Sequence, residues 1–258
     1  MTELPLIGEA PADASGARLA GARIGVVTFP GTLDDRDAAR AVRLAGGTAV
    51  ELWHADTELG DVDAVVIPGG FSYGDYLRAG AIARFAPLMT KIIDAANSDA
   101  KLPVLGICNG FQALLRLGLL TGGGLAPNDS GHFECRWIWM RRPDNARSPL
   151  LDGIDRIAMP IGHGEGRFVA KDAASLVGLE ARGEVGLVYC DAVGNPGGYP
   201  VNPNGSDAAV AALTNAAGNV LGLMPHPERN VSIGQAPAGR ADGMGLTVFT
   251  NALRMARG

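Results

Sequence analysis

The sequence contains only three cysteines, Cys108, Cys135 and Cys190, and none of them stands in a Cys-x-x-Cys spacing. An odd, small number of cysteines in a chain of 258 residues is typical of free thiols in a reducing compartment, and excludes a disulfide framework. The histidines and cysteines also lack the spacing of a zinc site, so we expect no metal centre.

Long apolar runs and clusters of positive charge are missing too. No apolar stretch approaches ~18 residues, the length that crosses a membrane as a helix. No run of lysine and arginine is longer than a pair, and the net charge is −5. We therefore expect neither a membrane segment nor a nucleic-acid partner. The N-terminal stretch MTELPLIGEAPADASG lacks a basic region followed by an apolar one, so we expect no signal peptide and a cytoplasmic protein.

What the sequence has in excess is glycine, 37 of 258 residues, and these glycines follow no Gly-x-y period that would indicate collagen. Hydrophobic residues make up 47% and charged residues 19%, which excludes a disordered chain. Residues 1–22 are rich in alanine, proline, glycine and acid, and we expect a flexible extension there. Residues 23–258 contain no linker or repeat and predict a single domain.

The first half of this domain alternates between short β-branched apolar runs and stretches with helical spacing. Such runs are typical of buried strands in a parallel sheet with right-handed helical crossovers. The expected strands cover residues 22–29, 48–53, 63–68 and 102–107, and the expected helices cover 34–44, 76–85, 88–96 and 111–120.

The second half differs, because its strand-like runs follow one another with glycine, proline and asparagine turns between them. They cover residues 133–140, 155–162, 184–191 and 208–215, before a buried strand at 220–225 and a closing helix at 245–257. We therefore expect one α/β domain with a mostly parallel central sheet, helices on both faces and a small antiparallel decoration.

Cys108 is the first candidate for chemistry. It ends an apolar strand, precedes an expected helix, and has Gly106 and Gly110 two residues away on either side. Small residues there permit the tight strand-to-helix turn of a nucleophile elbow. The amides and dipole of a helix N-terminus favour a thiolate over a thiol. A buried structural cysteine is the alternative, which the Gly-x-Cys-x-Gly spacing makes weaker.

A thiolate nucleophile needs a proton shuttle, and His226 is the best placed histidine for that role. It follows the last expected strand, in the segment MPHPER. Pro227 favours an extended backbone at His226, and in an extended segment residues two apart share a face. Glu228 can then accept the imidazole N–H and fix its tautomer. The alternative is a turn whose histidine and glutamate are merely solvated.

A glycine-rich loop, PGGFSYGD at residues 68–75, follows the third expected strand. Glycines let backbone N–H groups point into a cleft, so Gly69 and Gly70 predict an oxyanion hole facing Cys108. A phosphate-binding loop and an ordinary strand-to-helix turn are the alternatives. No Gly-x-Gly-x-x-Gly or Walker pattern supports the former.

Three other polar features carry less information. The loop His163–Phe168 mixes charge with glycine and is a candidate ligand or partner loop, although its composition also suits a surface turn. Residues 202–206, NPNGS, have the composition of a turn. His54 and His132 have no supporting context.

Together, these motifs resemble a known family. GICNGFQ around Cys108 and PHPE around His226 are similar, as a pair, to class I glutamine amidotransferases. More narrowly, PGGFSYGDYLRAGAIA, GICNGFQ, HGEGRF, NPNGS and GLMPHPER, in this order, resemble the glutaminase subunits of phosphoribosylformylglycinamidine synthases over residues 23–258. Two positions depart from that pattern: PGTLDD at residues 30–35 replaces a Ser-Asn-Cys-like stretch, and Val188 replaces an arginine.

The resemblance implies a flavodoxin-like fold and a catalytic triad for glutamine hydrolysis. In this family's chemistry Cys108 would attack the side-chain amide of glutamine and form a thioester. His226 would move the protons, and Glu228 would orient His226. The amides of Gly70 and Asn109 would bind the oxyanion.

Gln112, one turn into the helix after Cys108, would hold the amino-acid end of glutamine. The resemblance also implies partners: a synthetase subunit, which uses ATP and Mg²⁺ to convert formylglycinamide ribonucleotide to the amidine, and a small accessory subunit. This chain, which has no ATP motif, would bind no cofactor itself.

Two other functions stay open at this point. One is a free-standing cysteine hydrolase that acts on another amide or ester. The other is a non-catalytic flavodoxin-like binding module with a vestigial Cys–His–Glu set. A fold alone does not choose among them, whereas glutamine turnover with and without a partner does.

Overall fold

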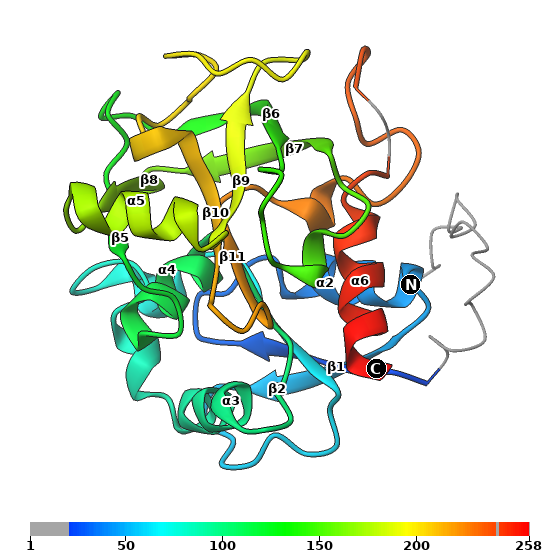
Figure 1. The fold of residues 1–258 in the computed structure, drawn as a ribbon. Coiled ribbons are helices and arrows are strands. Elements are labelled where there is room, and N and C mark those ends of the chain that lie inside the picture. Colours follow the sequence, from blue (N-terminus) through cyan, green and yellow to red (C-terminus); the bar gives the residue numbers. More distant parts are fainter. Residues whose placement is uncertain (1–20, 241–242, 258) are drawn as a thin grey trace.

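The computed structural model describes residues 21–240 and 243–257. Its centre is a nine-stranded sheet in the order β2-β1-β3-β4-β11-β10-β9-β6-β7 (Figure 1). The first five strands in this order are parallel. They are β1 Arg23–Thr28, β2 Thr48–Trp53, β3 Ala64–Ile67, β4 Val104–Ile107 and β11 Val220–Leu223. The predicted α/β fold with a largely parallel sheet is confirmed.

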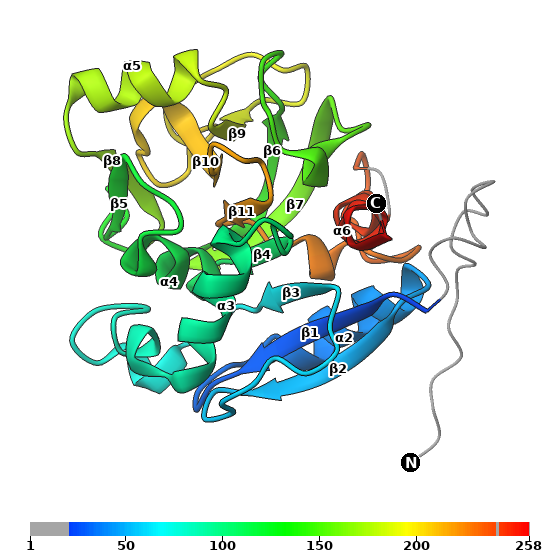
Figure 2. The same ribbon diagram turned by 60° about the horizontal axis from the view of Figure 1, so that its bottom comes forward.

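Helices cover both faces of the sheet. They are α2 Asp35–Leu44, α3 Pro87–Asn97, α4 Asn109–Leu117, α5 Ala173–Ala181 and α6 Leu246–Arg257. α2 and α3 lie in crossovers between parallel strands, and α6 follows the last strand. β2 lies on one side of β1 and β4 on the far side of β3, so right-handed crossovers place α2 and α3 on opposite faces. Figure 2 shows α2 lying along β1 and β2. α6 packs against α2, and α4 packs against β4 and β11.

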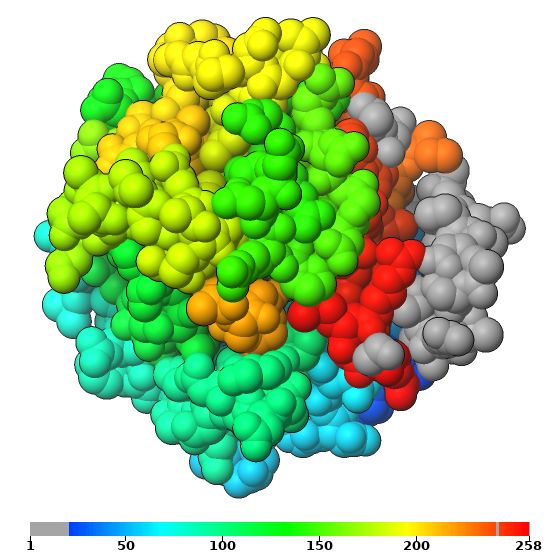
Figure 3. Space-filling view, in the orientation of Figure 1, coloured from blue at the N-terminus to red at the C-terminus, as the bar shows by residue number. Residues whose placement is uncertain are grey.

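The antiparallel strands extend the same central sheet beyond β11. They are β10 Val210–Thr214, β9 Val185–Cys190, β6 Glu134–Arg141 and β7 Arg156–His163. A separate two-stranded antiparallel sheet joins β5 Gly123–Ala126 to β8 Arg167–Ala170. In the space-filling view the antiparallel half, green to yellow, forms the upper part of the visible face, and α3 lies at its lower end (Figure 3). The sequence analysis did not predict β5, β8 or α5.

The central strands are buried because both faces of the sheet are covered. Every residue of β3, β4 and β11 is buried, whereas the edge strand β2 buries fully only Leu52. Strands buried on both faces read as continuous apolar runs, which is why their sequences predicted them so directly. This packed centre gives a rigid base to the loops at the ends of its strands.

The helix expected at residues 76–85 is wrong. Only a 3-10 helix at Ile82–Phe85 forms there, after another at Ser72–Asp75. Tertiary contacts hold the chain just before this segment: the Phe71 N–H donates to Gly31 O at 2.9 Å, and the Ser72 N–H donates to Asn109 Oδ1 at 3.0 Å. Two non-glycine residues of this segment, Leu77 and Arg78, have a positive φ, which a helix excludes, and so do Tyr73 and Asp75 just before it.

At the N-terminal side, the predicted extension at residues 1–22 falls almost entirely outside the described residues. Ala22 is described, is fully buried, and accepts a hydrogen bond from the Thr48 N–H at 2.8 Å, so it packs with the domain. Within residues 21–240 and 243–257, none of the helices has the length and apolar character that crossing a membrane requires.

Candidate active site

The candidate residues gather where four neighbouring parallel strands end. Four strands that lie next to one another in the sheet each lead to one residue of the candidate site. β1 leads to Asp34 and β3 leads to Gly70, while β4 leads to Cys108 and β11 leads to His226. These four residues line one cavity of about 450 Å³. Ligands of open α/β sheets bind at this edge, outside the carboxyl ends of the strands.

Cys108 sits at a sharp turn between β4 and α4. Its backbone has φ 50° and ψ −105°, a conformation that non-glycine residues rarely adopt. The Cys108 N–H donates to Leu223 O at 2.8 Å, which holds the turn against β11. The residue is only 6% exposed, and its Sγ lies 3.8 Å from Gly162 O. This is the geometry of a nucleophile elbow, as the sequence predicts.

The flanking glycines are required by close packing rather than by backbone dihedral angles. A Cβ at Gly110 would overlap Ile67 O, and a Cβ at Gly106 would overlap Leu114 Cδ1 and lie 2.9 Å from the Gly110 carbonyl group. The turn can therefore approach β3 and α4 this closely only without side chains at these two positions.

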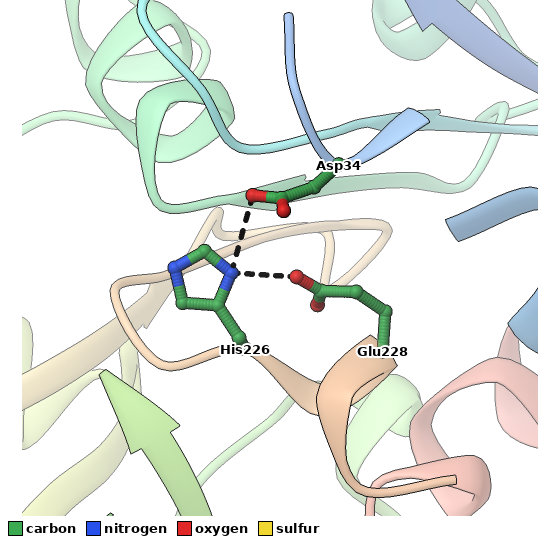
Figure 4. Close-up of side chains that lie close together, drawn as sticks. All are labelled: Asp34, His226 and Glu228. Atoms are coloured by element: carbon green, nitrogen blue, oxygen red, sulfur yellow. Dashed lines mark hydrogen bonds and ion pairs between the residues drawn. The ribbon is translucent and has the colours of Figure 1, made fainter. Parts of the chain in front are cut away.

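His226 and Glu228 form a buried pair directly after β11. The His226 Nδ1 and Glu228 Oε1 atoms are 2.5 Å apart, and each residue is 1% exposed. Figure 4 shows the Glu228 carboxylate pointing at this nitrogen, with the second ring nitrogen on the far side. That second nitrogen, Nε2, is buried and has no hydrogen-bond partner among the described residues. Glu228 thus fixes the tautomer and leaves Nε2 available for chemistry.

Gly69 allows the sulfur and the imidazole to meet. A Cβ at this position would lie 2.9 Å from His226 Cε1 and 3.4 Å from Cys108 Cβ, so both side chains pack against the Gly69 backbone. The structure therefore brings together the cysteine and the histidine, which lie 118 positions apart in the sequence.

Two histidines of this cavity have opposite electrostatic surroundings. Burial lowers the pKa of His226, but the negative charges of Glu228 and Cys108 and the hydrogen bond to Glu228 outweigh it and raise the pKa to about 10. For His163, burial and then the charge of His226 lower the pKa to about 4. Near neutral pH, His226 therefore favours the imidazolium while His163 stays neutral.

Backbone donors for an oxyanion are present at two of the predicted positions. Neither the Gly70 N–H nor the Asn109 N–H has a hydrogen-bond partner within the described residues, whereas the Cys108 N–H is already used. Gly70 has φ 137°, and a Cβ there would lie 2.6 Å from Leu33 N. Only glycine fits a loop that passes so close to the segment after β1.

The side chains of Asn109 and Gln112 tie the surrounding loops together. Asn109 Nδ2 donates to Gln112 Oε1 at 2.8 Å and to Asp75 Oδ1 at 3.2 Å. Gln112 Nε2 donates to Glu165 O at 2.7 Å, and Gln112 also lines the cavity. Both amides are therefore engaged with the protein, and Gln112 would have to contact glutamine with its remaining hydrogen-bonding capacity.

Comparison with known proteins identifies the family. A family model described as the CobB/CobQ-like glutamine amidotransferase domain matches residues 21–255. Phosphoribosylformylglycinamidine synthase subunit PurQ of Streptomyces coelicolor is 53% identical over 237 residues, which are 90% of this chain and 97% of that protein. The PurQ subunit of Rhodococcus jostii is 50% identical over 227 residues, or 87% and 94% of the two chains. This chain belongs to the PurQ family.

Solved structures agree with that assignment. A chain in the structure of PurLQS from Thermotoga maritima is 37% identical, with a TM-score of 0.73, and the match covers 90% of this chain and 98% of that one. A Thermoplasma acidophilum protein, described as a putative GMP synthase subunit, has a TM-score of 0.60 at 15% identity, with 91% and 94% coverage. That second likeness shows the shared fold alone.

The sequence analysis assigned no role to several groups that line the cavity. Asp34 lies 3.5 Å from His226 Nδ1 by its Oδ2 atom, and Arg229, Asp75 and Glu165 also reach the cavity. Asp34 follows the end of β1, so the rule that located Cys108 and His226 could also have found it. The other three lie in segments that the sequence analysis did single out, at residues 68–75, 163–168 and 224–229, but their side chains were given no role there.

The loop at residues 163–168 is part of the site and not only a surface turn. His163 is 3% exposed and lines the cavity, and its Nδ1 lies 3.0 Å from Asn128 Oδ1. The turn at residues 202–206 supports this loop, because Asn204 Nδ2 donates to Gly166 O at 2.8 Å. His54 has a structural contact, with its Nδ1 2.7 Å from the Tyr73 hydroxyl.

Asp34, His226 and Glu228 place three metal-ligand atoms within 4.8 Å of one another, although the sequence analysis expected no metal site. A cation there would have to replace the 2.5 Å contact between Nδ1 and Glu228. It would also stand beside Arg229, whose Nη2 lies 2.5 Å from Asp34 Oδ1. We therefore interpret the cluster as a hydrogen-bonded group that holds the imidazole.

Proposed function

We propose that this chain is the glutaminase subunit of a phosphoribosylformylglycinamidine synthase and uses Cys108, His226 and Glu228 as its catalytic triad. The observation that carries the assignment is the buried His226–Glu228 pair, whose free nitrogen shares one cavity with the strained Cys108 turn. A chain of the PurQ family with this arrangement has what thioester chemistry on an amide needs: a nucleophile, a proton shuttle and an orienting acid.

The first half of the reaction forms the thioester. The Cys108 thiolate attacks the side-chain amide carbon of glutamine, a C–S bond forms, and the carbonyl electron pair moves to oxygen. The Gly70 and Asn109 N–H groups would stabilise this oxyanion, each contributing about 10²–10³ in rate. The His226 imidazolium then gives its Nε2 proton to the amide nitrogen, the C–N bond breaks, and ammonia leaves.

The second half returns the enzyme to its starting state. Neutral His226 takes a proton from water, which attacks the thioester carbon and forms a C–O bond. The C–S bond breaks, glutamate leaves, and the thiolate–imidazolium pair is restored. Glu228 keeps Nδ1 protonated throughout, so only Nε2 exchanges protons. The net reaction consumes one water per glutamine.

The ammonia would pass to a synthetase subunit, which would use ATP and Mg²⁺ to convert formylglycinamide ribonucleotide to the amidine. We further propose a small accessory subunit in the same complex, and the cytoplasm as its location. This chain contributes nitrogen only and binds no cofactor itself. The association is supported by the PurQ relatives and by the likeness to a chain of PurLQS.

The decisive experiment uses the complex reconstituted with its synthetase subunit. Cys108→Ser should abolish glutamine-dependent amidine formation and leave synthesis from added ammonium salt unchanged. Cys190→Ser, the same change at a cysteine that does not line the cavity, should leave both activities intact. Loss of both activities in Cys108→Ser would contradict a purely nitrogen-supplying role. Glutamate release that persists in Cys108→Ser would exclude Cys108 as the nucleophile.

A further inference from the structure

Asp34 is a buried carboxylate that the mechanism above does not use. It stands in the turn after β1, is 3% exposed, and has its Oδ2 atom 3.5 Å from His226 Nδ1. It also precedes α2, but its side chain makes no hydrogen bond to the first turn of that helix. Helix capping therefore does not explain why a carboxylate is buried here.

Arg229 holds Asp34 in place. Its Nη2 atom lies 2.5 Å from Asp34 Oδ1, while its Nε is 3.9 Å from Glu228 Oε1. A buried carboxylate without a partner is costly, and this contact compensates one of its two oxygens. The other oxygen remains directed at His226. Since Arg229 directly follows Glu228, one short turn supplies both the first carboxylate and the anchor of the second.

The two carboxylates approach the same nitrogen of the imidazole. Figure 4 shows Asp34 and Glu228 on the Nδ1 side of His226, with Nε2 directed away from both. A single N–H makes one short hydrogen bond, and Glu228 at 2.5 Å takes it. At 3.5 Å Asp34 acts mainly through its charge.

We propose that Asp34 is a second positioning carboxylate, which supports the imidazolium form of His226 together with Glu228 and is locked in that role by Arg229. This inference deepens the proposed function and rests on it. It means that the shuttle is held by two acids instead of one.

The charge balance around His226 gives the size of the effect. Four titratable groups from four different segments surround the His226 ring, and Arg229 lies behind the two carboxylates. The four groups are Asp34, Cys108, His163 and Glu228. A charge within about 4–6 Å typically moves a pKa by 1–3 pH units. The positive charge of Arg229 offsets part of the effect of Asp34, so we expect about one pH unit.

The first test follows alkylation of Cys108 by iodoacetamide over a pH series, in a Cys135→Ser background so that the exposed thiol does not react. Only the thiolate reacts, and the imidazolium stabilises it. The alkylation rate should change again at about pH 10, where His226 loses its proton and the thiolate is freed from the ion pair. Asp34→Asn should move this alkaline step down by about one pH unit. Asp35→Asn, which removes the same charge one residue later, should not move it. Coinciding Asp34→Asn and Asp35→Asn profiles would overturn the proposal.

A second readout separates positioning from structural support. In the complex, Asp34→Asn should lower kcat for glutamine about tenfold with KM unchanged. The loss should be larger in a Glu228→Gln background, because the two acids support one ring. Equal losses in both backgrounds would contradict a shared role. If the Asn variant does not fold, Asp34→Ser, which suits a position before a helix, replaces it.

The two proposals fail in different ways. Alkylation needs no glutamine turnover, so an inactive wild-type complex would refute the proposed function while the profiles still report on Asp34. If the complex hydrolyses glutamine normally and Asp34→Asn leaves the alkylation profile unchanged, only the inference about Asp34 is refuted.

Discussion

In the proposed mechanism, proton transfer depends on His226 far more than on the residues that support it. His226 has Nε2 as its only free nitrogen, while Glu228 orients the opposite side of the ring. His226→Ala removes the shuttle, whereas Glu228→Gln keeps an oxygen that can accept the Nδ1–H bond. We expect the loss in kcat/KM for glutamine to be at least about tenfold greater for His226→Ala.

The control for this comparison is His132→Ala, at an exposed histidine, which should change kcat/KM by less than about twofold, as surface substitutions usually do. Steady-state glutamate release by the complex measures all three variants. The opposite order, with Glu228→Gln the more damaging, would mean that Glu228 itself moves protons.

The same cavity also sets how stability depends on pH. The pKa of His163 falls to about 4 in the folded protein, so between about pH 6.5 and 4 only the unfolded chain binds this proton. The free energy of unfolding should fall over that range, by about 3 kcal/mol from this group. His226, with its pKa raised to about 10, has the opposite sign and loses stability as the pH rises from about 6.5 towards 10.

Stability should therefore be greatest near pH 6.5, which urea unfolding at a series of pH values measures. His163→Gln, whose amide can still contact Asn128, should flatten the acid side of that curve, and His132→Gln should not. An acid slope unchanged by His163→Gln would mean that His163 is not held neutral.

At the scale of elements, the junction between β4 and α4 is the part least tolerant of added atoms. Gly110→Ala places a Cβ against Ile67 O, which belongs to the backbone of β3 and cannot turn away. We expect the free energy of unfolding to fall by at least about 2 kcal/mol, and we expect glutaminase activity to be lost as well.

Gly124→Ala is the matched control, because nothing lies within 4 Å of a Cβ in β5 and its φ is ordinary for alanine. It should change stability by less than about 0.5 kcal/mol. Urea unfolding midpoints of Gly110→Ala and Gly124→Ala measure the difference in stability. A stable, active Gly110→Ala would show that the elbow can shift away from β3.

Elements could be predicted where local pattern and tertiary packing agree. The strands around residues 64–67 and 104–107 are buried on both faces, so their apolar runs suffice to identify them. The helix prediction for residues 76–85 failed because Leu77 and Arg78 have positive φ. They follow a loop whose first residues, 71 and 72, donate hydrogen bonds to the distant residues Gly31 and Asn109. α5 was missed although Asp172 caps it by accepting from the Ser175 N–H at 2.7 Å, a signal present in the sequence.

The same distinction applies to the site. Cys108 and His226 follow buried strands, so strand-end logic and the motifs located both. Asp34 follows a buried strand as well, but its partner Arg229 is 195 residues away, and no local pattern joins them. The strand order places β1 next to β3 and β3 next to β4. Only this three-dimensional arrangement identifies Asp34 as a second carboxylate beside His226.

At the scale of the whole molecule, the argument concerns coupling to a partner. Ammonia released without a synthetase is lost, so a subunit that supplies nitrogen should hydrolyse glutamine slowly alone. The proposed oxyanion donor Gly70 belongs to a loop that continues through four non-glycine residues with positive φ, a backbone that binding can readjust. We expect glutamate release to rise about 5–150-fold on complex formation, which corresponds to about 1–3 kcal/mol of coupling.

The measurement compares kcat/KM of the isolated chain and of the complex, with the Cys108→Ser complex as the blank. Alkylation of Cys108 by iodoacetamide in the isolated chain tells whether the thiolate is already formed before the partner binds. Rapid alkylation with slow turnover would place the control at the oxyanion loop, because the nucleophile is ready and only the donors are misplaced. High turnover without the partner would contradict the coupling and favour a free-standing amide hydrolase.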